Sequence, residues 1–419
     1  MTLENGLKIL VLPDPSTPAV THMVWYQVGA ADDPKEHPGL AHFLEHMMFR
    51  GSKNLSPGQF SRLISAEGGQ ENAFTTRDMT VFHQQVAADR LELVMRLEAE
   101  RMAHLTLDPE EVDRERQVIL EERRARVENH PASMLKEQMR GALFHGTSFA
   151  HPTLGSDHDI RSIRVEDLQR FYREHYQPNR AMLVVAGNVT PETVKTLAER
   201  HFGPLRASQE QKKPVSATLS EPPAEPLTLA IPHLKQALWM RDYLAPSQAT
   251  ENKEHAYPLL VLAHVLGGSE VSRLARSLIY EKKIVSEVST SYNDLSRFPT
   301  SFSLVIAPAE SIPASLPQLV EDELRRIAKD GVTTEELTLA KSTLTAQAVY
   351  GRDSTAAIAT LYGTAAATHA STDYPDTLIA KLDAVGNDDI KAAAEMLLKQ
   401  PQVTGHLIPE PLLSKEETP

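Results

Sequence analysis

The chain has 419 residues, of which 41% are hydrophobic, so it can bury a sizeable core, and this length predicts two or more domains. Its formal net charge of −13 argues against nucleic acid as the main partner, because binding to phosphates requires a basic surface. The chain contains no cysteine, which excludes disulfides and thiolate metal sites, so any metal must be held by His, Asp or Glu.

The N-terminal segment is predicted to be the first strand of a domain rather than a targeting signal. The stretch MTLENGLKILVLP has no basic region at its start, and its apolar run is too short for a secretory signal. No apolar run in the sequence is long enough to span a bilayer. We therefore expect a soluble protein without a membrane partner, cytoplasmic as the chain stands and periplasmic if a leader has been removed.

Strand-like segments alternate with long helical patterns along the chain. The predicted strands, rich in β-branched and aromatic residues, are KILVL (8–12), THMVWYQVG (21–29), MLVVAG (182–187), LTLAI (227–231) and SFSLVIA (301–307). Helical patterns cover 89–105, 110–127 and 316–328. A polar, proline-containing stretch at 206–225 suits an extended linker. The predicted organisation is a first half at 1–205, a linker at 206–225, a second half at 226–409 and a tail at 410–419.

The two halves resemble each other in two places. Residues 37–51 resemble residues 255–268, and residues 165–189 resemble residues 387–410; both pairs lie roughly 220 residues apart, as an internal repeat requires. A shared helix-then-strand pattern is the alternative explanation. In the second copy, apolar residues at 261–263 stand where the first copy has polar groups, so one half would carry the chemistry and the other a different role.

The stretch AHFLEHMMFRG (41–51) places His42, Glu45 and His46 on one face of a predicted helix, with an apolar face opposite. Two imidazoles one turn apart can hold zinc, and a carboxylate beside them can accept a proton from an attacking water. An ordinary solvated helix surface is the alternative, because an HxxEH string also arises by chance. A metal site would need a third ligand.

The helix predicted at 110–127 offers that third ligand. Asp108 suits its N-cap and Pro109 its first position. Glu115 and Glu122 recur with aliphatic residues on one face, where buried carboxylates would be costly unless a cation neutralised them. The alternative is that this face is solvated, since the helix is charged all round.

Three segments resemble the inverzincin peptidases of the pitrilysin and insulinase group: HFLEHMMFRGS (42–52), ENAFTTRDMTVFH (71–83) and DRERQVILEE (113–122). The resemblance covers nearly the whole chain and is to two-domain bacterial proteins related to mitochondrial processing peptidase. It implies an α+β fold of two related halves arranged around a cavity, each half a mostly antiparallel sheet with helices on one face.

The resemblance also assigns the residues of a metal site. His42, His46 and Glu122 would bind one zinc ion per chain. Glu45 would be the general base, and Glu115 would be a carboxylate that orients a ligand or tunes the metal. The set implies a zinc metalloendopeptidase that hydrolyses peptides or short unfolded segments with a zinc-activated water.

The stretch ENAFTT (71–76) matches an exposed edge strand in the family. Asn72 and Ala73 would contact the substrate backbone there, because main-chain pairing gives affinity with little demand on sequence. An ordinary strand after a glycine turn is the alternative. Two other functions also remain open for the chain: a non-catalytic structural or assembly subunit on the same fold, and a metal-independent peptide-binding module.

The second half departs from the family pattern. The family's catalytic proteins usually carry an Arg and a Tyr that reach the substrate, and Tyr280 and Glu287 stand in those positions here. A phenol lacks the planar fork of a guanidinium, and a carboxylate would repel a developing oxyanion. A small shift of the alignment could bring Lys282 or Tyr292 into range. Otherwise, the partner of this chain is expected to be a related second subunit that supplies the Arg/Tyr pair.

Overall fold

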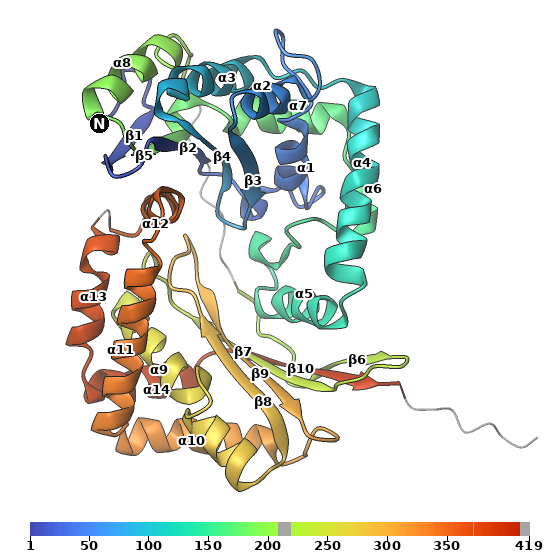
Figure 1. The fold of residues 1–419 in the computed structure, drawn as a ribbon. Coiled ribbons are helices and arrows are strands. Elements are labelled where there is room, and N and C mark those ends of the chain that lie inside the picture. Colours follow the sequence, from blue (N-terminus) through green and yellow to red (C-terminus); the bar gives the residue numbers. More distant parts are fainter. Residues whose placement is uncertain (208–218, 372, 411–419) are drawn as a thin grey trace, which may run out of the picture. The chain divides into compact units, whose positions relative to one another are not determined.

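The structure is a computed structural model that describes residues 1–207, 219–371 and 373–410. These residues form two compact units, each with one five-stranded sheet (Figure 1). Most of the predicted linker at 206–225 and nearly all of the predicted tail at 410–419 lie outside the described residues.

The first unit comprises the described residues of 1–124, 146–218 and 348–375. Its sheet has the strand order β1–β5–β2–β4–β3, in which β1 and β5 are parallel and the other neighbours are antiparallel. The strands are β1 (Lys8–Pro13), β2 (Ala19–Tyr26), β3 (Gln70–Thr75), β4 (Thr80–Ala87) and β5 (Ala181–Gly187). The α-helices are α1 (Leu40–Met47), α2 (Gln59–Ala66), α3 (Leu91–His104), α4 (Pro109–Arg123), α6 (Asp157–Ser162), α7 (Val165–His175), α8 (Pro191–His201) and α12 (Thr355–Ala367).

The second unit comprises the described residues of 125–145, 219–347 and 376–419. Its sheet has the order β6–β10–β7–β9–β8, with β6 and β10 parallel and the other neighbours antiparallel. The strands are β6 (Leu227–Ile231), β7 (Leu238–Ala245), β8 (Val285–Tyr292), β9 (Thr300–Pro308) and β10 (Gln402–Pro409). The α-helices are α5 (Pro131–Leu143), α9 (Ala256–Gly267), α10 (Leu316–Asp330), α14 (Asn387–Leu398) and most of α11 (Thr334–Tyr350) and α13 (Tyr374–Ala384).

The two sheets have the same topology, strand for strand. Corresponding strands such as β2 and β7 begin about 220 residues apart, the period of the faint sequence repeat. The prediction of an α+β fold with two related, mostly antiparallel halves is therefore confirmed. The division of the sequence at 206–225 stays a prediction, because each compact unit also takes one helical segment from the other half of the chain.

In the first unit, one face of the sheet is covered by α1, α3, α7 and α8, whose apolar side chains form the main core with the strands. The opposite face is covered by α12, which comes from the second half of the sequence. Gly363 of α12 lies directly on the indole of Trp25, where an added Cβ would come within 2.2 Å of two ring carbons. The glycine therefore permits this close approach of helix to sheet.

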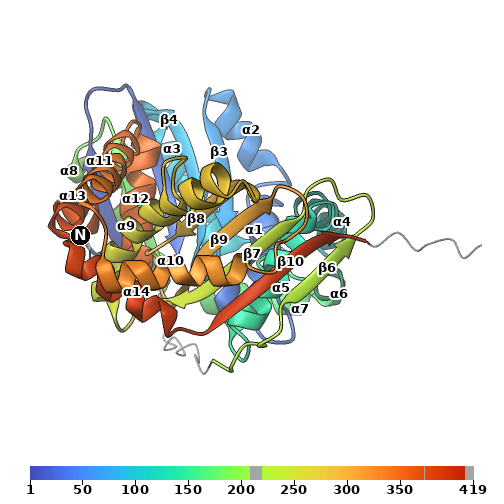
Figure 2. The same ribbon diagram turned by 90° about the horizontal axis from the view of Figure 1, so that it is seen from below.

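The second unit repeats this arrangement. Helices α9, α10 and α14 form a core on one face of its sheet, and α5, from the first half of the sequence, lies against β10 and β6 on the other face (Figures 1 and 2). Gly405 of β10 faces Met139 of α5, and a Cβ there would come within 2.4 Å of the methionine sulfur. The prediction of helices on one face of each sheet did not anticipate this reciprocal exchange of helices.

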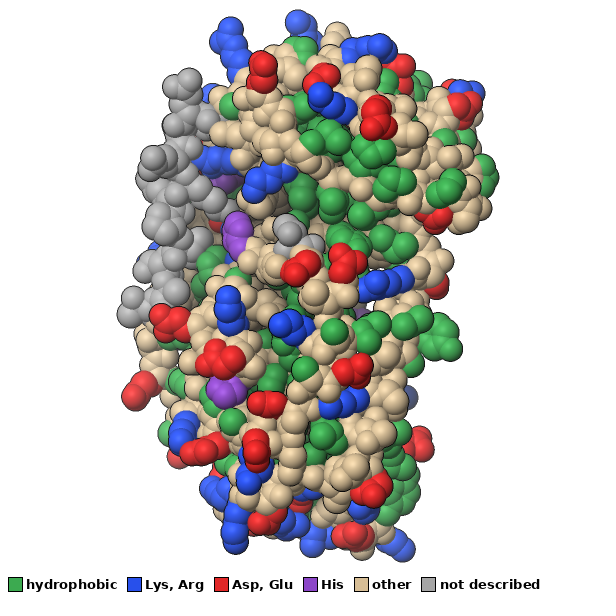
Figure 3. Space-filling view, turned by 90° about the vertical axis from the view of Figure 1, so that its left-hand side faces the viewer, with side chains coloured by type: hydrophobic (Ala, Val, Ile, Leu, Met, Phe, Trp, Pro, Cys, Tyr) green, Lys and Arg blue, Asp and Glu red, His purple; other side chains and the backbone are tan. Residues whose placement is uncertain are grey.

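On the face of the molecule shown in Figure 3, acidic and basic side chains lie interspersed. Among the described helices, none combines the length and the apolarity that crossing a membrane would require.

Candidate metal centre

Helix α1 carries the HxxEH motif, and the fold fixes both its start and its apolar face. The carboxylate of Asp33 accepts hydrogen bonds from the backbone N–H groups of Gly39 (2.7 Å) and Ala41 (2.8 Å), which have no partner within the helix. Gly39 has a φ of 89°, and a Cβ there would come within 2.5 Å of the Leu154 carbonyl oxygen. The apolar face predicted from the sequence is buried in the core: Leu40, Phe43, Leu44 and Met47. Helix α1 lies beside α4 and β3 (Figure 1). Its polar face is directed towards them, because His46 lies 3.2 Å from Glu122 and Glu45 is hydrogen-bonded to Thr75.

Helix α4 begins as predicted, with the side chain of Asp108 accepting a hydrogen bond of 2.8 Å from the amide of Glu110 and with Pro109 at the first position. The face that carries Glu115 is buried rather than solvated, since Glu115 is only 3% exposed. The solvated alternative for this face is therefore excluded.

Three of the predicted residues converge on one point between α1 and α4. The Nε2 atoms of His42 and His46 lie 3.5 Å and 3.2 Å from the same oxygen, Oε2 of Glu122. One potential ligand atom from each of the three residues lies within 4.8 Å of the other two. Two imidazole nitrogens and one carboxylate oxygen match the donor sets of catalytic zinc sites, so these residues fit a zinc ion.

The neighbouring Glu121 is directed elsewhere. Its side chain is 69% exposed and pairs with Arg124, whereas that of Glu122 is 16% exposed and faces the two histidines. Glu122, 76 positions after His46, is thus the carboxylate that the fold brings to the imidazoles.

Glu115 contacts His46 at Nδ1, the ring nitrogen that does not face Glu122. Its Oε2 accepts a hydrogen bond of 3.1 Å from Nδ1 of His46, and its Oε1 lies 2.6 Å from Nη2 of Arg50. Because a carboxylate only accepts, Nδ1 carries the proton and Nε2 is directed towards Glu122. The chain from Arg50 through Glu115 therefore orients the imidazole of His46.

The electrostatic surroundings of His46 favour positive charge. Burial lowers the pKa of His46, but hydrogen bonds to Glu115 and Glu122 and the charges of nearby carboxylates outweigh burial and raise that pKa to about 9. A cluster of carboxylates that stabilises an imidazolium in this way also suits a bound cation.

Glu45 lies on the same face of α1 and is 8% exposed. Its Oε2 accepts a hydrogen bond of 2.5 Å from the hydroxyl of Thr75, the last residue of β3. Glu45, the predicted base, is thus hydrogen-bonded to β3, the strand that contains the predicted substrate-binding residues Asn72 and Ala73.

Strand β3 is at the edge of its sheet, as the family resemblance implied. Asn72 is exposed, Ala73 is partly buried, and they pair with His83 and Phe82 of β4. The Oδ1 atom of Asn72 accepts a hydrogen bond of 2.8 Å from the Ala73 amide, which satisfies one backbone donor of this strand.

The four residues considered for the Arg and Tyr positions lie in the second unit. Tyr280 is 56% exposed, and Lys282 and Glu287 are also exposed. Tyr292 is held by its own unit, because its hydroxyl donates a hydrogen bond of 2.6 Å to the carbonyl oxygen of Pro246. That bond argues against an alignment in which Tyr292 takes the family's Tyr position.

Sequence reasoning missed three residues that support the site: Asp33, Arg50 and Thr75. Arg50 and Thr75 stand inside segments that the family resemblance had already singled out, and Arg50 follows His46 by four residues, just beyond the end of α1. Asp33 lies outside the helix that it caps, and no sequence signal connects the two.

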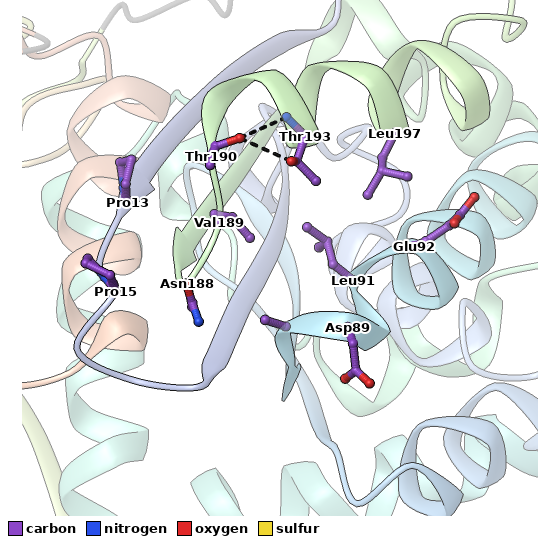
Figure 4. Close-up of a pocket in the computed structure, with 11 residues that line it drawn as sticks. Pro13, Pro15, Asp89, Leu91, Glu92, Asn188, Val189, Thr190, Thr193 and Leu197 are labelled. Carbon is purple, nitrogen blue, oxygen red and sulfur yellow. Dashed lines mark hydrogen bonds between the residues drawn. The ribbon is translucent and has the colours of Figure 1, made fainter.

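A separate hollow of about 600 Å³ lies on the first unit, where β1 and β5 end and α3 and α8 begin (Figure 4). None of the predicted site residues lines it. Its two carboxylates, Asp89 and Glu92, are bound by Arg90 and Arg200. This hollow therefore lacks the chemistry of the metal centre.

Comparison with known proteins decides the family. A model described as "Insulinase (Peptidase family M16)" matches residues 8–157, and one described as "Peptidase M16 inactive domain" matches residues 162–344. The chain belongs to the M16 (insulinase) family of peptidases. The first match, at residues 8–157, contains the histidine motif and Glu122. The second match, at residues 162–344, covers most of the second half of the chain, which lacks these residues.

The similarity of this M16 chain to its relatives covers most of its length. It is 27% identical over 356 residues to "Uncharacterized zinc protease YmxG" of Bacillus subtilis, covering 84% of each chain. It is 26% identical over 414 residues to "Mitochondrial-processing peptidase subunit beta" of Lentinula edodes, covering 95% of this chain and 86% of the relative. Among solved structures, a protease from Helicobacter pylori superposes with a TM-score of 0.88 at 25% identity, covering 98% of both chains.

Proposed function

We propose that the chain is a zinc metallopeptidase that hydrolyses peptides or short unfolded segments, and that it acts as the catalytic subunit of a heterodimer. The observation that carries the proposal is the convergence of His42, His46 and Glu122, with Glu45 on the same helix face. Membership of a peptidase family whose relatives include named zinc proteases supports it.

The donor set would hold one zinc ion per chain. His42, His46 and Glu122 would be the ligands, and Glu115 would keep His46 in the tautomer that binds through Nε2. Zinc, when bound, supplies a Lewis acid that polarises the scissile carbonyl and lowers the pKa of water.

Residues of this chain would carry out the proton transfer and hold the substrate. Glu45 would take the proton of the attacking water and pass it to the leaving amine nitrogen. Asn72 and Ala73 would hold an extended substrate by pairing along the free edge of β3. Main-chain pairing of this kind selects for an unfolded or extended segment rather than for a particular sequence.

The heterodimer is proposed because the second half lacks the expected substrate-binding pair. Exposed Tyr280 and Glu287 replace an Arg and a Tyr, and the hydroxyl of Tyr292 is bonded within its own unit. One transition-state donor contributes on the order of 10²–10³ in rate, so the lone chain should bind zinc and cleave slowly. A relative named as a subunit of a processing peptidase supports a partnered enzyme.

The test is cleavage of a mixed peptide library by the zinc-loaded chain, alone and with related chains that carry the Arg/Tyr pair and lack HxxEH. We expect slow cleavage alone and at least about 100-fold faster cleavage with the right partner. Full activity from the single chain, unchanged by any partner, would refute the heterodimer. A non-catalytic assembly subunit would show no cleavage under any combination, and a metal-independent binding module would bind peptides without zinc.

A further inference from the structure

Thr75 connects the strand proposed to bind substrate with the proposed base. Its hydroxyl donates a hydrogen bond of 2.5 Å to Oε2 of Glu45, two residues along β3 from Ala73. Glu45 is 8% exposed, so little water competes for this carboxylate oxygen. A hydrogen bond to a shielded carboxylate is among the stronger kinds in proteins.

The neighbouring groups leave Glu45 as the acceptor of the hydroxyl proton of Thr75. The neighbouring hydroxyl of Thr80 donates its own proton to the carbonyl oxygen of Val28 at 2.9 Å, and the two threonine oxygens lie 3.4 Å apart. An ionised carboxylate can only accept, and Glu45 at 2.5 Å is far closer than the Thr80 oxygen, so the one hydroxyl proton of Thr75 goes to Glu45.

The strand holds the Thr75 side chain in a defined direction. Side chains alternate along a strand, so Thr75 and Ala73 share the face covered by α1, while Phe74 points to the other face and contacts Trp25 at 6.1 Å between ring centroids. A β-branched side chain also has few accessible rotamers. The hydroxyl is therefore presented to α1 with little freedom.

We propose that Thr75 is a positioning residue that fixes the orientation of the Glu45 carboxylate relative to the strand that binds substrate. The inference rests on the proposed function. One rigid strand then sets both partners of the reaction: Asn72 and Ala73 place the substrate backbone, and Thr75 places the base. Holding a base within a fraction of an ångström of its working geometry acts on the chemical step rather than on binding.

The experiment compares Thr75→Val, which removes the hydroxyl and nearly keeps the shape, with Thr75→Ser, which keeps the hydroxyl. The matched control is Thr290→Val on β8, the edge strand of the other sheet, because the Thr290 hydroxyl also bonds to a helix, at the carbonyl oxygen of Ala263. Each zinc-loaded variant is assayed for zinc content, for kcat and KM on a peptide, and for affinity for a phosphinic peptide, a tetrahedral mimic of peptide hydrolysis.

We expect Thr75→Val to keep its zinc and its KM within about threefold and to lose about 10- to 100-fold in kcat, because a hydrogen bond to a charged group is removed. Affinity for the phosphinic peptide should fall by a similar factor, Thr75→Ser should recover most of both losses, and Thr290→Val should match the wild-type chain. The inference would be overturned if a rise in KM accounted for the whole loss of kcat/KM in Thr75→Val, or if Thr75→Ser did not recover kcat. Either result would assign Thr75 a merely structural role.

The same assays separate this inference from the proposed function. If the wild-type chain neither hydrolyses peptides nor binds the phosphinic peptide, alone or with any of the related partner chains, the proposed function fails and the inference fails with it. A wild-type chain that does either, with Thr75→Val within twofold of it in every measurement, overturns the inference alone.

Discussion

Replacing carboxylates one at a time along α4 should give a graded loss of zinc affinity that depends on which histidine nitrogen each carboxylate faces. Glu122 lies 3.2 Å and 3.5 Å from the two Nε2 atoms, Glu115 lies 3.1 Å from the far nitrogen of His46, and Glu121 is exposed beside Arg124. Substitution by Gln keeps the shape of each side chain and removes its charge. The three variants therefore differ mainly in where the charge is lost.

The expected sizes follow from these positions. A residue that orients a ligand typically contributes 10- to 100-fold to metal affinity, so Glu115→Gln should weaken zinc binding by about that factor. Glu122→Gln removes a ligand and should exceed about 100-fold, or roughly 2.7 kcal/mol. Glu121→Gln should stay within about twofold, because an exposed ion pair contributes little.

Competition with a chelator would measure the zinc dissociation constant of each variant, and thermal unfolding of the same metal-free samples would control for folding. Equal losses in Glu121→Gln and Glu122→Gln, or no loss in either, would refute the ligand assignment. A loss in Glu115→Gln as large as that in Glu122→Gln would mean that Glu115 binds the metal directly.

Two further changes test the surroundings of the site and the packing of the fold. Arg50→Met should lower zinc affinity less than Glu115→Gln does, with Arg50→Lys intermediate, because Arg50 acts only through that carboxylate; an effect larger than that of Glu115→Gln in the same chelator assay would contradict this order. Gly363→Ala should destabilise the protein by about 1–3 kcal/mol in urea unfolding, since its methyl would overlap the rigid indole of Trp25. Gly405→Ala, whose methyl would meet a flexible methionine, should cost less, and the reverse order would show that α12 does not dock through Gly363.

Local patterns in the sequence predicted the parts of the site that lie within one helix. The i, i+4 spacing places His42 and His46 on one face, and the capping signal of Asp108 marks the start of α4. Pairing the histidines with Glu122 required the family resemblance, because no local pattern relates residues 76 positions apart. The structure then separates Glu122 from Glu121 by exposure.

The missed features depend on contacts between distant segments. Helix α12 carries mostly small or apolar side chains around its circumference, so its sequence does not indicate which sheet it covers. Only the fold shows that it covers the sheet containing Trp25. The bond from Thr75 to Glu45 joins a strand to a helix 30 positions earlier. Hydrophobic periodicity indicates which face of an element is buried but not which polar group meets it there.

The most direct test of the proposed peptidase is Glu45→Gln, with zinc content and peptide hydrolysis measured on the same samples, alone and with the most effective partner chain. The account predicts that the variant keeps its zinc, because Glu45 is not a ligand, and loses hydrolysis by about 10²–10⁴, the usual contribution of a general base. Loss of the metal would make Glu45 a ligand, and zinc-loaded Glu45→Gln that cleaves peptides at the wild-type rate would contradict the account.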